Sequence, residues 1–248
     1  MWWARRADAR PGLAEVFDDT ERTRWTRYRK TEDQDRFLVG CALAKAVAAG
    51  YTGQQAADVR LDRTCTECGA PHGKPRVVGA DLELSISHSG DLIVVAASSG
   101  AVLGVDVERN DGRRDTEALT RFILAEGERP PAGAGEPRVF VRAWTRKEAV
   151  TKATGDGLRV PFSQVVVSGA DEPPRVIAWP YPESPDSVSL FDLDAPDGYL
   201  AALAVIGGCD RVDIRDGSAL LSGLAKSITV RDKFATCVRH SSPRTGRA

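Results

Sequence analysis

The chain has 248 residues, enough for one or two compact units with a buried core. Hydrophobic residues at 42% and charged residues at 28% exclude a wholly disordered protein, and a net charge of −1 gives no overall basic surface for nucleic acid. The chain starts without an apolar leader, and its longest uncharged run, residues 92–105, is too short to span a membrane. We therefore expect a cytoplasmic protein with no membrane partner.

Helix and strand patterns alternate in the first half of the chain. Apolar residues recur at helical spacing from Thr31 to about Ala49, and Thr31 with Gln34 has the pattern of a capping box. Gly50 is expected to end this helix, and residues 60–79 are rich in turn formers. Three strands are then predicted, over residues 84–87, 92–97 and 102–108.

The second half shows a similar mixture of patterns. Helices are predicted over residues 115–124 and from about Phe140 to Thr154, where Gly155 follows. The glycine- and proline-rich residues 127–138 between them are expected to form a mobile loop. Short strands are predicted near residues 164–168, 187–193 and 199–206.

The order of these patterns predicts an α+β protein made of two halves. The first half covers residues 1–102 and the second covers residues 103–208. The remaining residues, 209–248, carry more basic than acidic side chains and end in the run Ser-Ser-Pro-Arg-Thr-Gly-Arg-Ala. We expect this last segment to be a disordered tail.

Two carboxylates share one face of the strand predicted over residues 102–108. Side chains alternate along a strand, so Asp106 and Glu108 point the same way while Val105 and Val107 point into a core. Gly104 leaves space on the carboxylate face. Two neighbouring carboxylates repel each other unless a cation or a proton lies between them. The structural alternative is a solvated edge strand.

A third carboxylate lies on the helix predicted to end at Gly155. Helical spacing stacks Trp144, Glu148 and Lys152 on one stripe, with Lys147 beside them. Glu148 would complete a set of oxygen ligands for a hard cation such as Mg²⁺, which often bridges to phosphates. The alternative is a solvent-facing ion pair beside a half-buried tryptophan.

Two polar motifs precede the carboxylate strand. Gly73-Lys74-Pro75 lies in a turn region, and Ser87 and His88 lie at the end of a predicted strand, where the histidine could meet an anionic ligand. The structural alternative for His88 is an ordinary hydrogen-bonded side chain.

Cys65 and Cys68 are spaced as a zinc knuckle, and His72 with Cys41, Cys209 or Cys237 could complete a site. Because only one Cys-x-x-Cys pair is present, we expect a plain turn with reduced thiols there.

The motifs occur in an order that resembles the Sfp-type 4'-phosphopantetheinyl transferases. The resemblance covers about residues 20–207. The matching motifs are Gly73-Lys74-Pro75, Leu84-Ser-Ile-Ser-His-Ser, Gly104-Val-Asp-Val-Glu and Trp144-Thr-Arg-Lys-Glu-Ala-Val-Thr-Lys. This sequence departs from the family pattern at Leu84 and Ser85, where the family usually has phenylalanine and asparagine. The resemblance implies a monomer of two pseudo-symmetric α+β halves with Mg²⁺ and coenzyme A in the cleft between them.

The same resemblance implies an activity and a role for each matching residue. The enzyme would move the phosphopantetheine arm of coenzyme A onto a serine of an apo acyl, polyketide or peptidyl carrier protein, as in secondary metabolite biosynthesis, and release adenosine 3',5'-bisphosphate. Asp106, Glu108 and Glu148 would hold the metal, and Glu148 with Lys152 would act in catalysis. The residues implied to contact coenzyme A are Arg24, Arg36, Lys74, Pro75, Ser87, His88, Lys147 and Lys152. Among them, Lys147 and Lys152 would contact the pyrophosphate, and Arg24 and Arg36 would lie near the 3'-phosphate.

Two other functions are compatible with parts of the sequence. A zinc-stabilised nucleic-acid-binding module could use Cys65, Cys68 and the basic tail, but Phe234 is the only aromatic residue beyond residue 208. A family member that binds carrier proteins without catalysis is the second alternative. The complete set of three carboxylates and two lysines argues against it.

Overall fold

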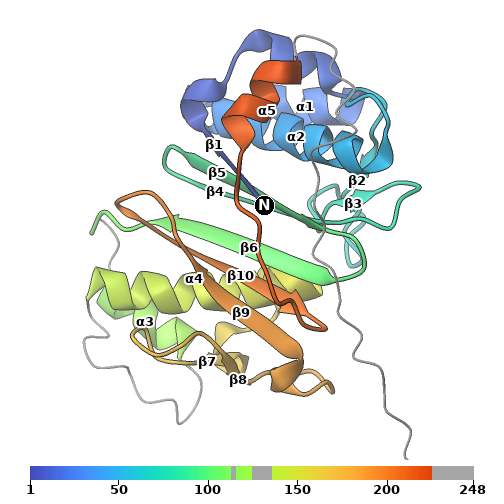
Figure 1. Ribbon diagram of the computed structural model, residues 1–248. Coiled ribbons are helices and arrows are strands. Elements are labelled where there is room, and N and C mark those ends of the chain that lie inside the picture. The colour runs from blue at the N-terminus through green and yellow to red at the C-terminus, as the bar shows by residue number, and fades with distance from the viewer. Residues whose placement is uncertain (113–115, 125–135, 225–248) are drawn as a thin grey trace, which may run out of the picture.

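Two β-sheets pack face to face between two layers of helices in the computed structural model, which describes residues 1–112, 116–124 and 136–224 (Figure 1). One sheet and its helices come mostly from the first half of the chain, and the other sheet and its helices come from the second half. This layering confirms the predicted α+β fold of two halves. No helix in the described part of the chain is both long enough and apolar enough to cross a membrane.

The first sheet has six strands in the order β11-β1-β5-β4-β3-β2. Strand β1 runs antiparallel to β5 and parallel to β11. The strands are β1 (Trp2–Arg5), β2 (Leu61–Asp62), β3 (Arg76–Val77), β4 (Glu83–Ser89), β5 (Leu92–Ser98) and β11 (Arg215–Asp216), and the helices that cover them are α1 (Asp19–Arg27), α2 (Thr31–Thr52) and α5 (Gly217–Leu224).

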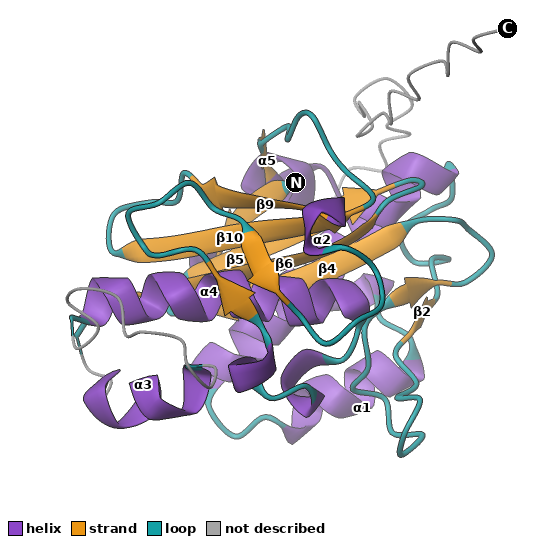
Figure 2. Cartoon of the chain, turned by 90° about the horizontal axis from the view of Figure 1, so that it is seen from below, coloured by secondary structure: helices purple, strands orange, loops and turns teal. Residues whose placement is uncertain are grey.

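The second sheet has three antiparallel strands in the order β6-β10-β9, and a separate two-stranded ribbon pairs β7 with β8. Helix α4 packs along β6 and β10, with α3 beside it (Figure 2). The elements are β6 (Val102–Arg109), β7 (Val166–Val167), β8 (Val176–Ala178), β9 (Val188–Leu193), β10 (Tyr199–Ile206), α3 (Thr116–Ile123) and α4 (Pro137–Thr154). Short 3₁₀ turns cover Arg6–Asp8, Pro11–Val16, Gly157–Arg159, Phe162–Gln164 and Pro185–Ser187.

The two long helices each end at a glycine, and the side-chain cap predicted for the start of α2 is absent. Helix α2 begins after Lys30 without a side-chain cap, and the amide of Gln34 donates to the Tyr28 carbonyl oxygen, so the expected capping box does not form. The helix continues through Gly50 and ends at Gly53, whose φ of 73° lies in the left-handed region. Helix α4 ends in the same way at Gly155, as predicted.

Alternation along the central strands divides the core into layers. One face of the first sheet carries Leu84, Ile93 and Val95, which pack against α2. The opposite face carries Leu92 and Val94, which pack against the inner face of the second sheet. The same strands therefore hold both halves of the molecule together.

A ladder of serine hydroxyls also joins the two sheets. Strand β6 is the edge of the second sheet, so every other N–H along it has no partner on a neighbouring strand. These N–H groups donate to serine oxygens on β4 instead. The bonds run from Val105 to Ser85 (3.0 Å), from Val107 to Ser87 (3.3 Å) and from Arg109 to Ser89 (3.1 Å).

The chain returns to the first sheet after residue 209, which corrects the prediction of a disordered tail over residues 209–248 for the part up to residue 224. Strand β11 pairs with β1, and α5 packs on α2 with Leu221 fully buried. A Cβ atom on Gly217 would lie 2.6 Å from the Trp3 carbonyl oxygen, so only glycine fits this approach. The basic composition of this segment suggested disorder, but Leu221 and its apolar neighbours form a helical stripe that packs on the core. Residues 225–248 and most of the loop expected over 127–138 lie outside the described residues.

Candidate active site

A cleft of about 1000 Å³ opens between the two halves, bounded by β4, β6, the end of α4 and the loop that precedes β3. Its walls come from both halves of one chain, so a ligand in it would contact both. The predicted site residues that line the cleft are Lys74, Pro75, Ser87, His88, Asp106, Glu108, Glu148 and Lys152.

Close packing of α4 on β6 sets the position of the acidic residues. A Cβ atom on Gly104 would lie 2.2 Å from the Ala149 carbonyl oxygen, so the helix rests directly on the strand backbone at this glycine. Asp106 lies two residues further along the same strand face. The contact therefore brings Glu148 and Lys152 of the helix next to Asp106 of the strand.

Asp106 is the most enclosed carboxylate of the cleft, with only 2% of its surface exposed. Its Oδ1 accepts hydrogen bonds from the Ser87 hydroxyl at 2.8 Å and from the Lys152 ammonium at 2.6 Å. Its Oδ2 is buried and has no hydrogen-bond partner among the described residues. A buried carboxylate oxygen without a partner is costly, and it is a ready ligand for a cation.

Glu148 pairs with the same ammonium group, and Glu108 adds a negative charge to its surroundings. The Glu148 Oε2 lies 3.7 Å from the Lys152 Nζ, and the Ser89 hydroxyl donates to the Glu108 carboxylate at 2.7 Å. Burial raises the pKa of Glu148, although the charge of Lys152 opposes the shift. Burial alone would lower the pKa of Lys152, but Asp106 and Glu148 outweigh it, so the pKa is raised. Lys152 thus supplies the positive charge that the carboxylates need.

The donor chemistry of this group fits Mg²⁺. Carboxylate oxygens are the ligands that this ion prefers, and the buried Oδ2 of Asp106 is available to it. The carboxylates of Asp106, Glu108 and Glu148 are the residues that would hold the ion. The Lys152 ammonium lies between Asp106 and Glu148.

Lys74 and His88 are two further predicted site residues that line the cleft. Lys74 donates to the Ala153 carbonyl oxygen at 2.9 Å and pairs with Glu83 at 2.6 Å, so it bridges the two halves. Burial lowers the pKa of Lys74, against the effect of Glu83. Desolvation, together with the charges of Lys152 and Arg36, lowers the pKa of His88.

Sequence reasoning missed three further cations of the cleft. Arg63, Arg76 and Arg159 also line it. Arg159 is held by Asp156 at 3.0 Å and by Glu67 at 3.2 Å. These arginines lie in loops, at a strand end and in a 3₁₀ turn, where no periodicity identifies them; their closeness to Cys65, Lys74 and Gly155 in the sequence was the only available signal.

The structure places three predicted contacts of coenzyme A outside the cleft lining. Lys147 is fully buried, and its ammonium donates to the carbonyl oxygens of Ile123 and Phe162, the second at 3.2 Å, so the predicted pyrophosphate contact is wrong for this structure. Arg24 lies over the Phe37 ring at 5.3 Å. Arg36 donates to the Gly90 carbonyl oxygen at 2.6 Å and also pairs with an aspartate on α2.

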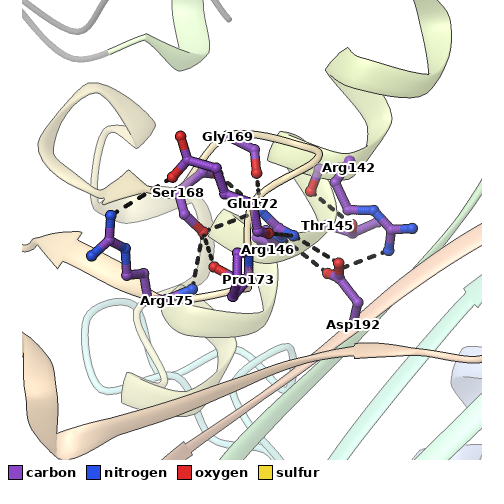
Figure 3. Close-up of polar contacts among 9 residues, drawn as sticks. All are labelled: Arg142, Thr145, Arg146, Ser168, Gly169, Glu172, Pro173, Arg175 and Asp192. Atoms are coloured by element: carbon purple, nitrogen blue, oxygen red, sulfur yellow. Dashed lines mark hydrogen bonds and ion pairs between the residues drawn. The ribbon is translucent and has the colours of Figure 1, made fainter.

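Arg146, next to Lys147 in the same motif, is also fully buried. Its guanidinium donates to both carboxylate oxygens of Asp192, at 2.9 and 2.7 Å (Figure 3). It also donates to the carbonyl oxygens of Ser168 (2.8 Å), Gly169 (2.7 Å) and Glu172 (3.1 Å). This side of α4 therefore anchors a loop and strand β9, while the Glu148 side faces the cleft.

Comparison with known families gives two adjoining matches. Residues 102–204 match the model of the 4'-phosphopantetheinyl transferase superfamily, and residues 2–100 match the model of the 4'-phosphopantetheinyl transferase N-terminal region. The two matches together span most of the chain and meet between β5 and β6.

Several curated relatives are similar over most of their length. The chain is 29% identical over 199 residues to the 4'-phosphopantetheinyl transferase HetI of Nostoc sp., covering 79% of this chain and 81% of the relative. It is 27% identical over 207 residues to a 4'-phosphopantetheinyl transferase of Bacillus subtilis, covering 81% and 88%. It is 25% identical over 186 residues to the transferase Sfp of Bacillus subtilis strain 168, covering 74% and 79%.

Proposed function

Because the chain belongs to the 4'-phosphopantetheinyl transferase superfamily, a family of enzymes that transfer phosphopantetheine from coenzyme A to carrier proteins, we propose that it is an Sfp-type transferase. Its substrates would be coenzyme A and an apo acyl, polyketide or peptidyl carrier protein of secondary metabolism. One chain supplies both walls of the cleft, so the proposed enzyme works as a monomer, in the cytoplasm.

The observation that carries this proposal is the convergence of Asp106, Glu148 and Lys152 in a cleft that further cations line. Coenzyme A brings a pyrophosphate and a 3'-phosphate, so its site needs several positive charges. Lys74, Arg76 and Lys152, which all line the cleft, provide them.

The proposed reaction is an attack of a carrier serine on the phosphorus that bears the pantetheine arm. The new bond joins the serine oxygen to this phosphorus, and the bond to the second phosphate of the pyrophosphate breaks. Adenosine 3',5'-bisphosphate leaves with the electron pair of that bond. Phosphoryl transfer of this kind depends mainly on positioning and charge neutralisation.

The residues of the cleft divide this work among them. Glu148 accepts the serine proton, because its carboxylate lines the cleft next to the Lys152 ammonium. Lys152 neutralises charge on the departing phosphate. Mg²⁺, when held by Asp106, Glu108 and Glu148, supplies Lewis acid stabilisation of the phosphate oxygens.

The test is mass spectrometry of several purified apo-carriers after incubation with the protein, coenzyme A and Mg²⁺. We expect each accepted carrier to gain the mass of one phosphopantetheine group, with no gain when Mg²⁺ is removed or when Asp106→Ala replaces the wild type. Fatty-acid, polyketide and nonribosomal-peptide carriers are compared in parallel, because their relative rates identify the preferred class. If no carrier of any class is modified while calorimetry still detects carrier binding, the protein is a binding module without catalysis.

A further inference from the structure

We propose that Cys65, Cys68 and His72 form a zinc site at the rim of the cleft. The sequence favoured a plain turn at this position, because it contains a single Cys-x-x-Cys pair. In the structure, the His72 side chain lies next to these two cysteines. Within the described residues, this is the one group of three or more potential ligands whose donor atoms all lie close to one another.

The distances suit a single small ion. The two sulfur atoms and one histidine nitrogen lie within 4.8 Å of one another, and the Cys68 Sγ is 3.0 Å from the His72 Nε2. Two ligands of a tetrahedral zinc lie about 3.6 Å apart, given Zn–S and Zn–N bonds of about 2.3 and 2.1 Å. The ion would therefore fit after side-chain shifts of less than about 1 Å.

The backbone holds this arrangement independently of the side chains. The Cys65 N–H donates to the Ala70 carbonyl oxygen at 2.9 Å, and the Gly69 N–H donates to the Cys65 carbonyl oxygen at 2.9 Å. Gly69 has a φ of 70°, which permits the tight turn after the second cysteine. The Gly73 N–H donates to the Arg63 carbonyl oxygen at 2.7 Å, and this bond folds the histidine back over the cysteine pair.

Chemistry selects the metal. Two thiolates balance the charge of a divalent ion, and thiolate with imidazole is a ligand set typical of zinc rather than of Mg²⁺. Cys41 is buried in the core of the first half and is not part of the group. Since the described residues offer no fourth close ligand, a solvent molecule would complete the coordination shell.

The position of the site indicates what the metal would do. Cys65 and His72 both line the cleft, and Lys74 follows two residues later and bonds to the Ala153 carbonyl oxygen of α4. Glu67, inside the knuckle, pairs with Arg159 of the second half at 3.2 Å. Zinc would thus fix a loop that contacts both halves at the mouth of the cleft.

Metal analysis of the full-length protein tests the proposal without reference to transfer activity. We expect wild-type protein grown with zinc to retain close to equimolar zinc after gel filtration, and Cys65→Ser/Cys68→Ser to lose it. Cys41→Ala, which removes a thiol outside the group, is the matched control and should retain the metal. Cobalt added to metal-free wild type should give a thiolate-to-cobalt charge-transfer band that the double variant lacks.

A single-ligand variant keeps the test decisive if the double variant fails to fold. His72→Ala removes one exposed ligand, and a chromophoric chelator should take zinc from it at a concentration at least about tenfold lower than from wild type. Wild-type protein that contains no zinc and gives no thiolate-to-cobalt band would overturn the proposal. Equal zinc retention by wild type and both ligand variants would overturn it as well.

Discussion

Both sides of helix α4 carry charged side chains, but these side chains have different roles on the two sides. Glu148 and Lys152 face the cleft, whereas Arg146 and Lys147 are fully buried and bond to the protein itself. Successive helical residues are about 100° apart, so neighbours in one motif can belong to opposite surroundings. A charged motif on a helix therefore mixes residues that meet a ligand with residues that hold the helix in place.

Replacing Glu148 should have the largest effect on activity. Glu148→Gln keeps the shape of the side chain but removes the proposed base and a metal ligand, so we expect single-turnover transfer to fall by about 10²–10⁴-fold. A variant that transfers at the wild-type rate would mean that Glu148 and Lys152 form only a solvated ion pair.

The same substitution should not harm stability, which separates the cleft side from the buried side. A folded-state pKa above the unfolded value means that ionisation of Glu148 opposes folding as the pH rises. In metal-free buffer, Glu148→Gln should therefore equal or exceed wild type in free energy of unfolding at neutral pH. This advantage should disappear below about pH 4, where glutamate is protonated in both states. Urea unfolding at the two pH values measures it.

Replacing Arg146 should lower stability and leave transfer activity unchanged, the reverse of the result expected for Glu148. Arg146→Met removes two hydrogen bonds to Asp192, which keeps only its ion pair with Arg142, and leaves several carbonyl oxygens without their donor. We therefore expect the free energy of unfolding to fall by about 3–5 kcal/mol. Transfer per folded molecule should be unchanged. Arg175→Met is the matched control, because its pair with Glu172 is exposed and 3.7 Å long and should contribute less than about 1 kcal/mol. Equal losses for the two variants would contradict the anchoring role of Arg146.

Replacing Lys152 should weaken the binding of coenzyme A by an intermediate amount. Lys152→Ala removes the proposed phosphate contact, and a charge-assisted hydrogen bond of about 1.5–3 kcal/mol corresponds to roughly 10–100-fold in affinity for coenzyme A. Lys152→Arg should recover part of that affinity, because the charge returns in a different shape. Calorimetry measures both. The alanine variant should also gain more thermal stability from Mg²⁺ than wild type does, since Asp106 loses its bonded ammonium.

Lys147 should have the smallest effect on binding. Its ammonium serves the carbonyl oxygens of Ile123 and Phe162, so Lys147→Met should cost about 1–3 kcal/mol of stability and leave the affinity for coenzyme A within about twofold of wild type. A folded Lys147→Met protein with greatly weakened coenzyme A binding would restore the pyrophosphate contact implied by the resemblance.

Periodicity predicted the elements that build the cleft. Alternation placed Asp106 on one face of its strand, and helical spacing placed Glu148 and Lys152 on one stripe, because both depend only on local geometry. The orientation of Lys147 was not predictable in this way. It depends on carbonyl oxygens of residues 123 and 162, which approach the helix only after the chain has folded.

Long-range pairing explains the other failures of prediction. Strand β11 has two residues and exists because β1 is beside it, so no local pattern identifies it. The resemblance implies that Arg24 and Arg36 contact a phosphate, whereas in the structure Arg24 lies over an aromatic ring and Arg36 donates to a backbone carbonyl oxygen. The chain has 34 lysine and arginine residues, so the sequence alone does not show which of them contact a ligand and which bond to the protein itself.

The return of the chain to β1 also sets an order of events on the ribosome. Trp2 pairs with Arg215, and the amino group of Met1 donates to the Asp213 carbonyl oxygen at 2.6 Å. At about 5–20 residues per second, synthesis takes roughly 10–40 s to reach β11 after β1 has been made. During that time β1 is an edge strand, and the site on α2 that α5 will cover remains open. The half that is translated first is therefore the half that finishes folding last.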